Sequence, residues 1–151
     1  MSKEISGGLN PTPIDNRDFR LEKVFGKIPI MELPEEDFTV AEPLFIEDQK
    51  GSDYCAACAA SSVMETTEKI DLDPLYAFAK AKQISGEWRS WGLDLRTICK
   101  AMVKFGCIAK KDSPYTINDK RETIANWENW PKDLDFKASF HRQKSYFRVD
   151  I

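Results

Sequence analysis

Cys55 is the side chain of this sequence best placed for covalent chemistry. It opens an Ala-rich stretch, 55–69, whose apolar spacing predicts a helix with Ser52 or Asp53 as the N-cap. A cysteine at a helix N-terminus lies at the positive end of the helix dipole, which favours the thiolate. A thiolate in this position is typical of a nucleophile that attacks a carbonyl carbon.

Acyl transfer also needs hydrogen-bond donors for the carbonyl oxygen that becomes negative. The first turn of the predicted helix supplies backbone N–H groups at the same end. Gln49 lies upstream across a Gly-containing loop, and its side-chain amide can provide a second donor. We therefore predict Cys55 as the nucleophile and Gln49 as the oxyanion donor, with no metal site and no cofactor.

The other cysteines leave two further interpretations open. Cys55 and Cys58 form a Cys-x-x-Cys at a helix start, the geometry of a thiol–disulfide exchange site. That fold needs a buried strand directly before the motif, and residues 48–54 are polar and loop-like instead. Zinc is less favoured because Cys99 and Cys107 have no close pairing. We expect Cys58, Cys99 and Cys107 to be small buried core residues.

The elements that must position Cys55 are predominantly helical. Besides the helix at 55–69, which its small residues predict to be buried and central, the pattern predicts the following elements: helices at 74–84 and 94–105, a loop at 85–92, a turn at 112–116 and a weaker helix at 119–129. Residues 1–47 are predicted to be an extended Pro-rich arm. Residues 145–151 alternate with period two and predict a strand without a partner.

The segment around Cys55 resembles the active-site segment of the papain-like cysteine peptidases. The Gln-x5-Cys spacing from Gln49, with Asp48 before it and a small-residue helix after it, is most similar to the prokaryotic and phage branch of that family. Further segments resemble the family in the same order: 16–19, 73–78, 92–96, 101–107, 113–115 and 144–149. Nearly the whole chain therefore aligns, although only the segment around Cys55 is specific.

The resemblance implies an α+β papain-like fold, of which this chain would be the mostly helical left lobe (48–151) preceded by the arm (1–47). The β-rich second lobe, which carries the catalytic histidine and its Asn or Asp partner, would be absent from the chain. Trp91 and Gly92 would form a wall of the substrate cleft. Three departures from the family pattern stand out: Asp53, a carboxylate expected to oppose thiolate formation, Ala56 and Cys58.

His141 is the only histidine in the sequence, and it lies in a basic connector whose counterpart in the family is not catalytic. Two functions therefore stay open. In the first, the chain hydrolyses peptide or isopeptide bonds, and a missing C-terminal lobe or a partner chain supplies the histidine. In the second, it is a catalytically inactive peptidase-like protein with a structural role among the subunits of a phage particle or another large complex.

The composition of the chain argues against some classes of binding partner. The formal charge of −3 and the pI near 5.3 argue against general, non-specific binding of nucleic acid, which usually requires an excess of basic residues. No apolar run approaches the roughly 20 residues needed to cross a bilayer, and the N-terminus lacks the apolar core of a signal peptide. We expect a protein of the cytoplasm, or one that reaches a virion or the exterior through a specialised system, with a peptide or protein as its substrate and no membrane or nucleic-acid partner.

Overall fold

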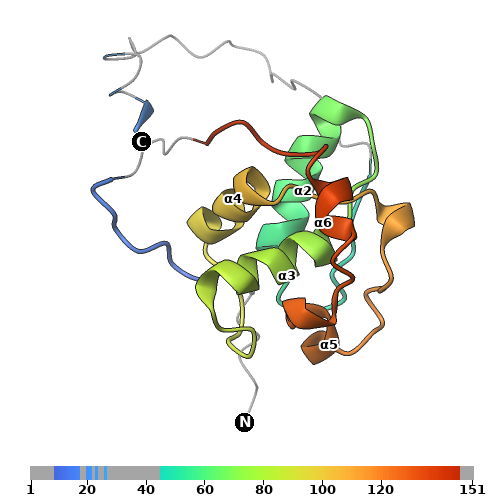
Figure 1. Ribbon diagram of the computed structural model, residues 1–151. Helices are drawn as coiled ribbons and strands as arrows, with labels where there is room; N and C mark the ends of the chain where they lie inside the picture. The colour runs from blue at the N-terminus through green and yellow to red at the C-terminus, as the bar shows by residue number, and fades with distance from the viewer. Residues whose placement is uncertain (1–8, 18–19, 22, 24–25, 27–44, 147–151) are drawn as a thin grey trace, which may run out of the picture.

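The computed structural model describes residues 9–17, 20–21, 23, 26 and 45–146, and this part of the chain is helical (Figure 1). In order, the elements are α2 (Cys55–Glu68), α3 (Pro74–Ser85), α4 (Leu95–Lys104), the 3-10 turn η1 (Lys110–Asp112), α5 (Arg121–Ala125), the 3-10 turn η2 (Trp127–Asn129) and α6 (Leu134–Ala138). The described residues contain isolated β-bridges and no longer strand.

The three long helices confirm the ranges expected from the sequence to within one or two residues. The weaker helix expected at 119–129 is instead two short pieces, α5 and η2, because Asn126 adopts an extended backbone and its side chain accepts from the Glu128 N–H, which starts a new turn. The helix α6 was not predicted. Its five residues are too few to show a helical period.

The helix at the centre of the molecule is α3, not α2 as the small residues of 55–69 suggested. Every residue of 74–82 is buried, and α2, α4 and α5 all pack against this helix (Figure 1). In contrast, α2 is buried on one side only: Ala59, Val63 and Thr67 are exposed at successive i, i+4 positions. Small residues permit close packing on every side of a helix, but they do not require it.

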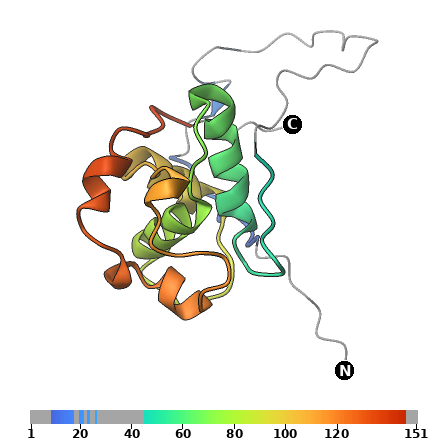
Figure 2. The ribbon, with the colours of Figure 1, turned by 90° about the vertical axis from the view of Figure 1, so that its right-hand side faces the viewer.

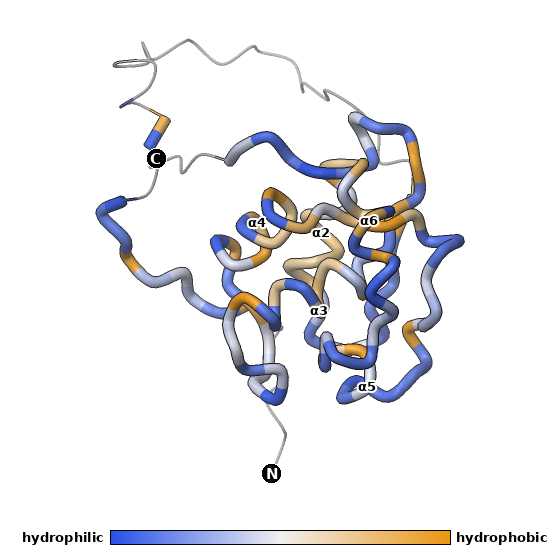
Figure 3. The backbone as a smooth tube through the Cα atoms, viewed as in Figure 1, coloured by the Kyte–Doolittle hydropathy of each residue, from blue (hydrophilic) through white to orange (hydrophobic). Residues whose placement is uncertain are grey.

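Local signals define the start of α3. Pro74 occupies the first turn, and the Asp73 carboxylate accepts hydrogen bonds from the Leu75 and Tyr76 N–H groups. This cap holds α3 in register while its aromatic side chains meet neighbours on both sides. Phe78 packs edge-on against Tyr54, the residue directly before α2, and the two ring centroids are 4.7 Å apart. Figure 3 shows apolar stretches of α2, α3 and α4 gathered at the centre and a mostly polar connection around α5.

One glycine lets the chain after α4 turn beneath α6. Gly106 has a φ of 85°, and a Cβ placed on it would lie 2.1 Å from the Ala138 carbonyl oxygen. The neighbouring Cys107 N–H donates to the His141 carbonyl at 2.9 Å. The Gln143 N–H donates to the Met102 carbonyl at 3.2 Å, so the C-terminal segment is attached to the helical body as far as Gln143.

Most of the predicted arm and strand lie outside the described residues. At one described part of the arm, Leu9 forms a parallel bridge with Leu93, and the Asn10 N–H donates to the Leu93 carbonyl at 2.9 Å. The division at residue 47 stays a prediction. In the range 145–151, only Ser145 and Tyr146 are described, and neither lies in a strand. No helix of the described part is long and apolar enough to cross a membrane.

Candidate active site

Cys55 is the first residue of α2 and is half-buried. The N-cap is Tyr54, whose side chain makes no capping hydrogen bond, so the prediction of Ser52 or Asp53 as the cap was wrong. The Ser52 hydroxyl instead donates to the Gln49 carbonyl at 2.6 Å. The backbone N–H groups of the first turn of a helix point along its axis toward its N-terminus, which in α2 is the end that carries the thiol.

A tight turn separates Gln49 from Cys55. Lys50 and Gly51 both have positive φ, at 49° and 72°, and the Ser52 N–H closes the turn onto the Gln49 carbonyl at 2.9 Å. Figure 2 shows this segment running alongside α2 before it turns back into the helix. The Gln49 Oε1 atom is buried and has no hydrogen-bond partner in the described part of the chain. The role of the Gln49 amide as an oxyanion donor stays a prediction.

Asp53 is fully buried but is not an uncompensated charge. The Arg121 guanidinium forms a two-pronged pair with it: Nε donates to Oδ1 at 3.0 Å, and Nη2 donates to Oδ2 at 2.7 Å. The Gly92 N–H also donates to Oδ2, at 2.7 Å. The expectation that this carboxylate would oppose the Cys55 thiolate treated it as isolated. In the structure, its charge is offset by a guanidinium and a backbone donor.

The same network holds the loop that contains Trp91 and Gly92. Arg121 Nη1 donates to the Trp88 carbonyl at 3.0 Å, and the buried Lys82 ammonium donates to the Ser90 and Gly92 carbonyls, each at 2.6 Å. Trp91 remains 46% exposed beside this anchored backbone. The structure therefore brings the predicted cleft wall against Asp53, two residues before the predicted nucleophile.

The other three thiols differ from one another in burial. Cys107 is buried, as expected, and hydrogen-bonds to the Asp73 carbonyl, whereas Cys58 and Cys99 are only half-buried. Burial raises the pKa of the Cys58 thiol to about 12, and it raises the pKa of Cys99 and Cys107 as well. These three thiols are therefore poor nucleophiles at neutral pH.

His141 lies at the wrong end of α2 to act on Cys55. Its Nδ1 pairs with the Glu68 carboxylate, and Glu68 is the last residue of the helix that Cys55 begins. A 14-residue helix is about 20 Å long. The sequence argument against a catalytic role for His141 is consistent with this placement.

Sequence reasoning missed Arg121 and Lys82, the two cations that organise this site. A buried carboxylate such as that of Asp53 needs a cationic partner, because an unpaired buried charge is strongly unfavourable. However, the chain has 22 Lys and Arg residues, and no spacing rule selects one that is far away along the chain. The expected signal exists only once the burial of Asp53 is known.

Comparison with solved structures supports the fold. The chain is similar to the crystal structure of xylellain, a cysteine protease from Xylella fastidiosa, with a TM-score of 0.70 and 22% sequence identity. The match covers 95% of this chain and 58% of the xylellain chain. No protein-family model and no curated protein sequence matches the chain. The described residues thus have the helical arrangement found in a papain-like cysteine protease.

Proposed function

We propose that this chain is the nucleophile-bearing lobe of a papain-like cysteine peptidase of the prokaryotic and phage type. The Cys55 thiolate attacks the carbonyl carbon of a peptide or isopeptide bond, the C–N bond breaks, the amine leaves with a proton from the base, and water then hydrolyses the resulting thioester. The N–H groups of the first turn of α2, together with the Gln49 amide, stabilise the oxyanion. The observation that carries the proposal is the placement of Cys55 as the first residue of α2, beside an anchored loop that exposes Trp91.

Such a reaction needs a base, and we propose that a further segment or a partner chain provides its histidine. His141 is held by Glu68 at the opposite end of α2. The exposed stripe of Ala59 and Val63 begins one helical turn after Cys55, and Val63 is 62% exposed. A second lobe docked on this stripe would bring its residues to the thiol. The match to 58% of the xylellain chain supports the view that this fold includes further structure.

A second candidate is a peptidase-like protein with a structural or assembly role. The position of the only histidine favours it, because the described part of the chain leaves Cys55 without an imidazole. A redox role for Cys55 and Cys58 is less well supported: residues 45–54, directly before the motif, form no strand.

The test is to treat the native assembly at neutral pH with an epoxide inactivator of cysteine peptidases and to map the adduct by peptide mass spectrometry. Selective modification of Cys55, reduced in Gln49→Ala and unchanged in Cys99→Ser, is the expected result. Equal and slow modification of all accessible thiols would show that Cys55 is not activated. The structural role would then replace the peptidase proposal.

A further inference from the structure

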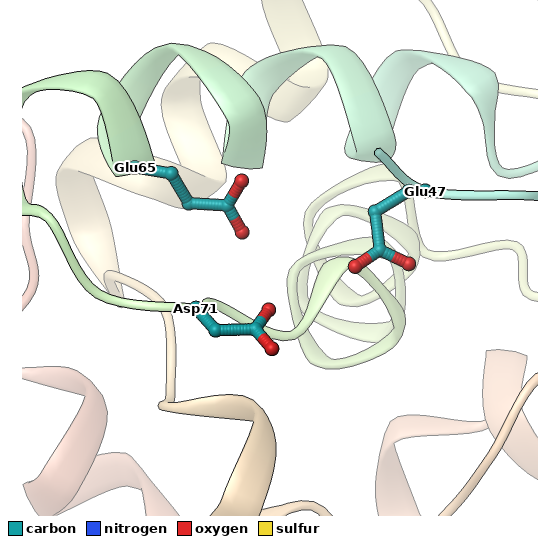
Figure 4. Close-up of side chains that lie close together, drawn as sticks. All are labelled: Glu47, Glu65 and Asp71. Carbon is teal, nitrogen blue, oxygen red and sulfur yellow. The ribbon is translucent and has the colours of Figure 1, made fainter. Parts of the chain in front are cut away.

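Three carboxylates from three separate segments converge beside α2 (Figure 4). Glu47 precedes the Gln49 turn, Glu65 belongs to α2, and Asp71 follows α2. One oxygen of each lies within 4.8 Å of the other two. None of the three takes part in the proposed peptidase chemistry.

Glu65 indicates that a ligand is needed here. The residue is only 1% exposed, and Figure 4 shows its carboxylate directed at the other two. Its Oε1 accepts from the Leu72 N–H at 2.9 Å, but its Oε2 is buried without a hydrogen-bond partner among the described residues. The buried Oδ1 of Asp71 lacks one in the same part of the chain. Buried carboxylate oxygens without a donor or cation are strongly unfavourable.

Lys110 offsets only part of this charge. Its ammonium pairs with Glu47 and lies 4.0 Å from the Asp71 Oδ1, and its side chain is 46% exposed. One ammonium therefore faces three carboxylates from the edge of the cluster.

We propose that Glu47, Glu65 and Asp71 bind a hard divalent cation, with Ca²⁺ preferred over Mg²⁺. An all-oxygen carboxylate set suits hard cations. Ca²⁺ accepts irregular geometry with six to eight oxygens at about 2.3–2.6 Å, and three oxygens as close together as these can share one such ion. Mg²⁺ demands a near-ideal octahedron, which three unrelated segments do not readily supply.

A cavity of about 260 Å³ adjoins the cluster on the side of Glu47, which lines it together with Lys110; Glu65 and Asp71 do not line it. Water entering from that side could complete the coordination of the ion. A bound cation would tie the segment that carries Gln49 to the middle of α2. The earlier expectation of no metal site rested on cysteine spacing, which says nothing about carboxylates brought together by the fold.

The proposal is tested by calorimetric titration of the full chain with CaCl₂, after treatment with EDTA and dialysis. We expect one site with a Kd of about 10⁻⁴ M or tighter. Glu65→Gln and Asp71→Asn should each weaken binding at least about tenfold, because each removes one ligand charge. Lys110→Met should tighten it by removing the competing ammonium. The control Asp133→Asn removes an exposed carboxylate outside the cluster and should change the Kd less than about twofold.

A second measurement keeps the test independent of folding defects. Ca²⁺ should raise the Tm of the unmodified chain and of Asp133→Asn, but not that of Asp71→Asn, whose side chain is 39% exposed and can be changed without opening the core. The proposal is overturned if neither the unmodified chain nor Lys110→Met binds Ca²⁺ at about 1 mM. It is equally overturned if Asp133→Asn weakens binding as much as Asp71→Asn, or if Mg²⁺ binds more tightly than Ca²⁺.

Discussion

Two carboxylates associated with α2 are buried to nearly the same degree but receive different numbers of hydrogen-bond donors. Asp53, two residues before the helix, is 0% exposed, and both of its oxygens receive donors from Arg121, with a further one from Gly92. Glu65, in the C-terminal half of the helix, is 1% exposed, and among the described residues only its Oε1 has a donor.

The comparison shows that the carboxylate before α2 is fully paired within its own chain, whereas the one near the C-terminus of α2 is only partly paired among the described residues. At the N-terminal end, the Asp53 network fixes the loop beside Cys55. At the other end, Glu65 and Asp71 have oxygens that the described residues leave unsatisfied. Burial alone therefore does not distinguish a structural carboxylate from a ligand; the count of its donors does.

The largest expected effect is that of removing Arg121, the cationic partner of the buried Asp53. Arg121→Met should lower the free energy of unfolding by about 3–5 kcal/mol, because it leaves the Asp53 charge buried without its partner. Urea denaturation measures this. The double variant Asp53→Asn/Arg121→Met should recover part of the loss, and Arg89→Met, which changes an exposed arginine of the same loop, should have little effect. A loss below 1 kcal/mol for Arg121→Met would contradict the comparison.

The second prediction has the opposite sign. In EDTA, Glu65→Gln should raise the free energy of unfolding by about 1–2 kcal/mol, because the amide keeps an acceptor for the Leu72 N–H and can donate to Asp71 or Glu47. Urea denaturation at neutral pH again measures it. If this variant is destabilised as strongly as Arg121→Met, the two ends of α2 are equivalent and the distinction fails.

The third prediction concerns how the contribution of Lys82 to stability depends on pH. Burial lowers the pKa of the Lys82 ammonium from 10.5 to about 8, an effect that Arg121 reinforces and that Asp53 and Glu87 oppose. Between these two pH values, the unfolded chain holds a proton that the folded chain has released, so this group makes stability rise with pH across that window. The Tm of the unmodified chain should therefore rise relative to that of Lys82→Met between pH 8 and pH 10.5. A constant difference would refute the shift.

The smallest expected effect lies at the far end of α2. Glu68→Gln, which weakens the half-buried pair with His141, should cost about 0–1 kcal/mol. His141→Asn should leave the modification rate of Cys55 unchanged, because the two residues lie at opposite ends of the helix. Thermal denaturation and inactivator labelling measure these outcomes. A marked loss of Cys55 labelling in His141→Asn would place the imidazole in the active site after all.

Local sequence signals were sufficient for the three long helices, α2, α3 and α4. The Asp73-Pro74 start of α3 and the small-residue run after Cys55 both act over one or two turns, so they can be recognised without knowledge of the fold. The same signals failed for α5, η2 and α6, which are too short to show a period. They also placed α2 at the centre, a position that depends on which faces other helices cover.

The sequence by itself determined that a cysteine begins a helix after a Gln-containing turn, because turn residues and a run of small helix-forming residues act between neighbours in the chain. Only the tertiary structure decided that Arg121 neutralises Asp53, that His141 lies at the far end of α2, and that Glu65 meets Glu47 and Asp71. These pairings join residues far apart in the chain. Their energies depend on burial and distance, which no local pattern encodes.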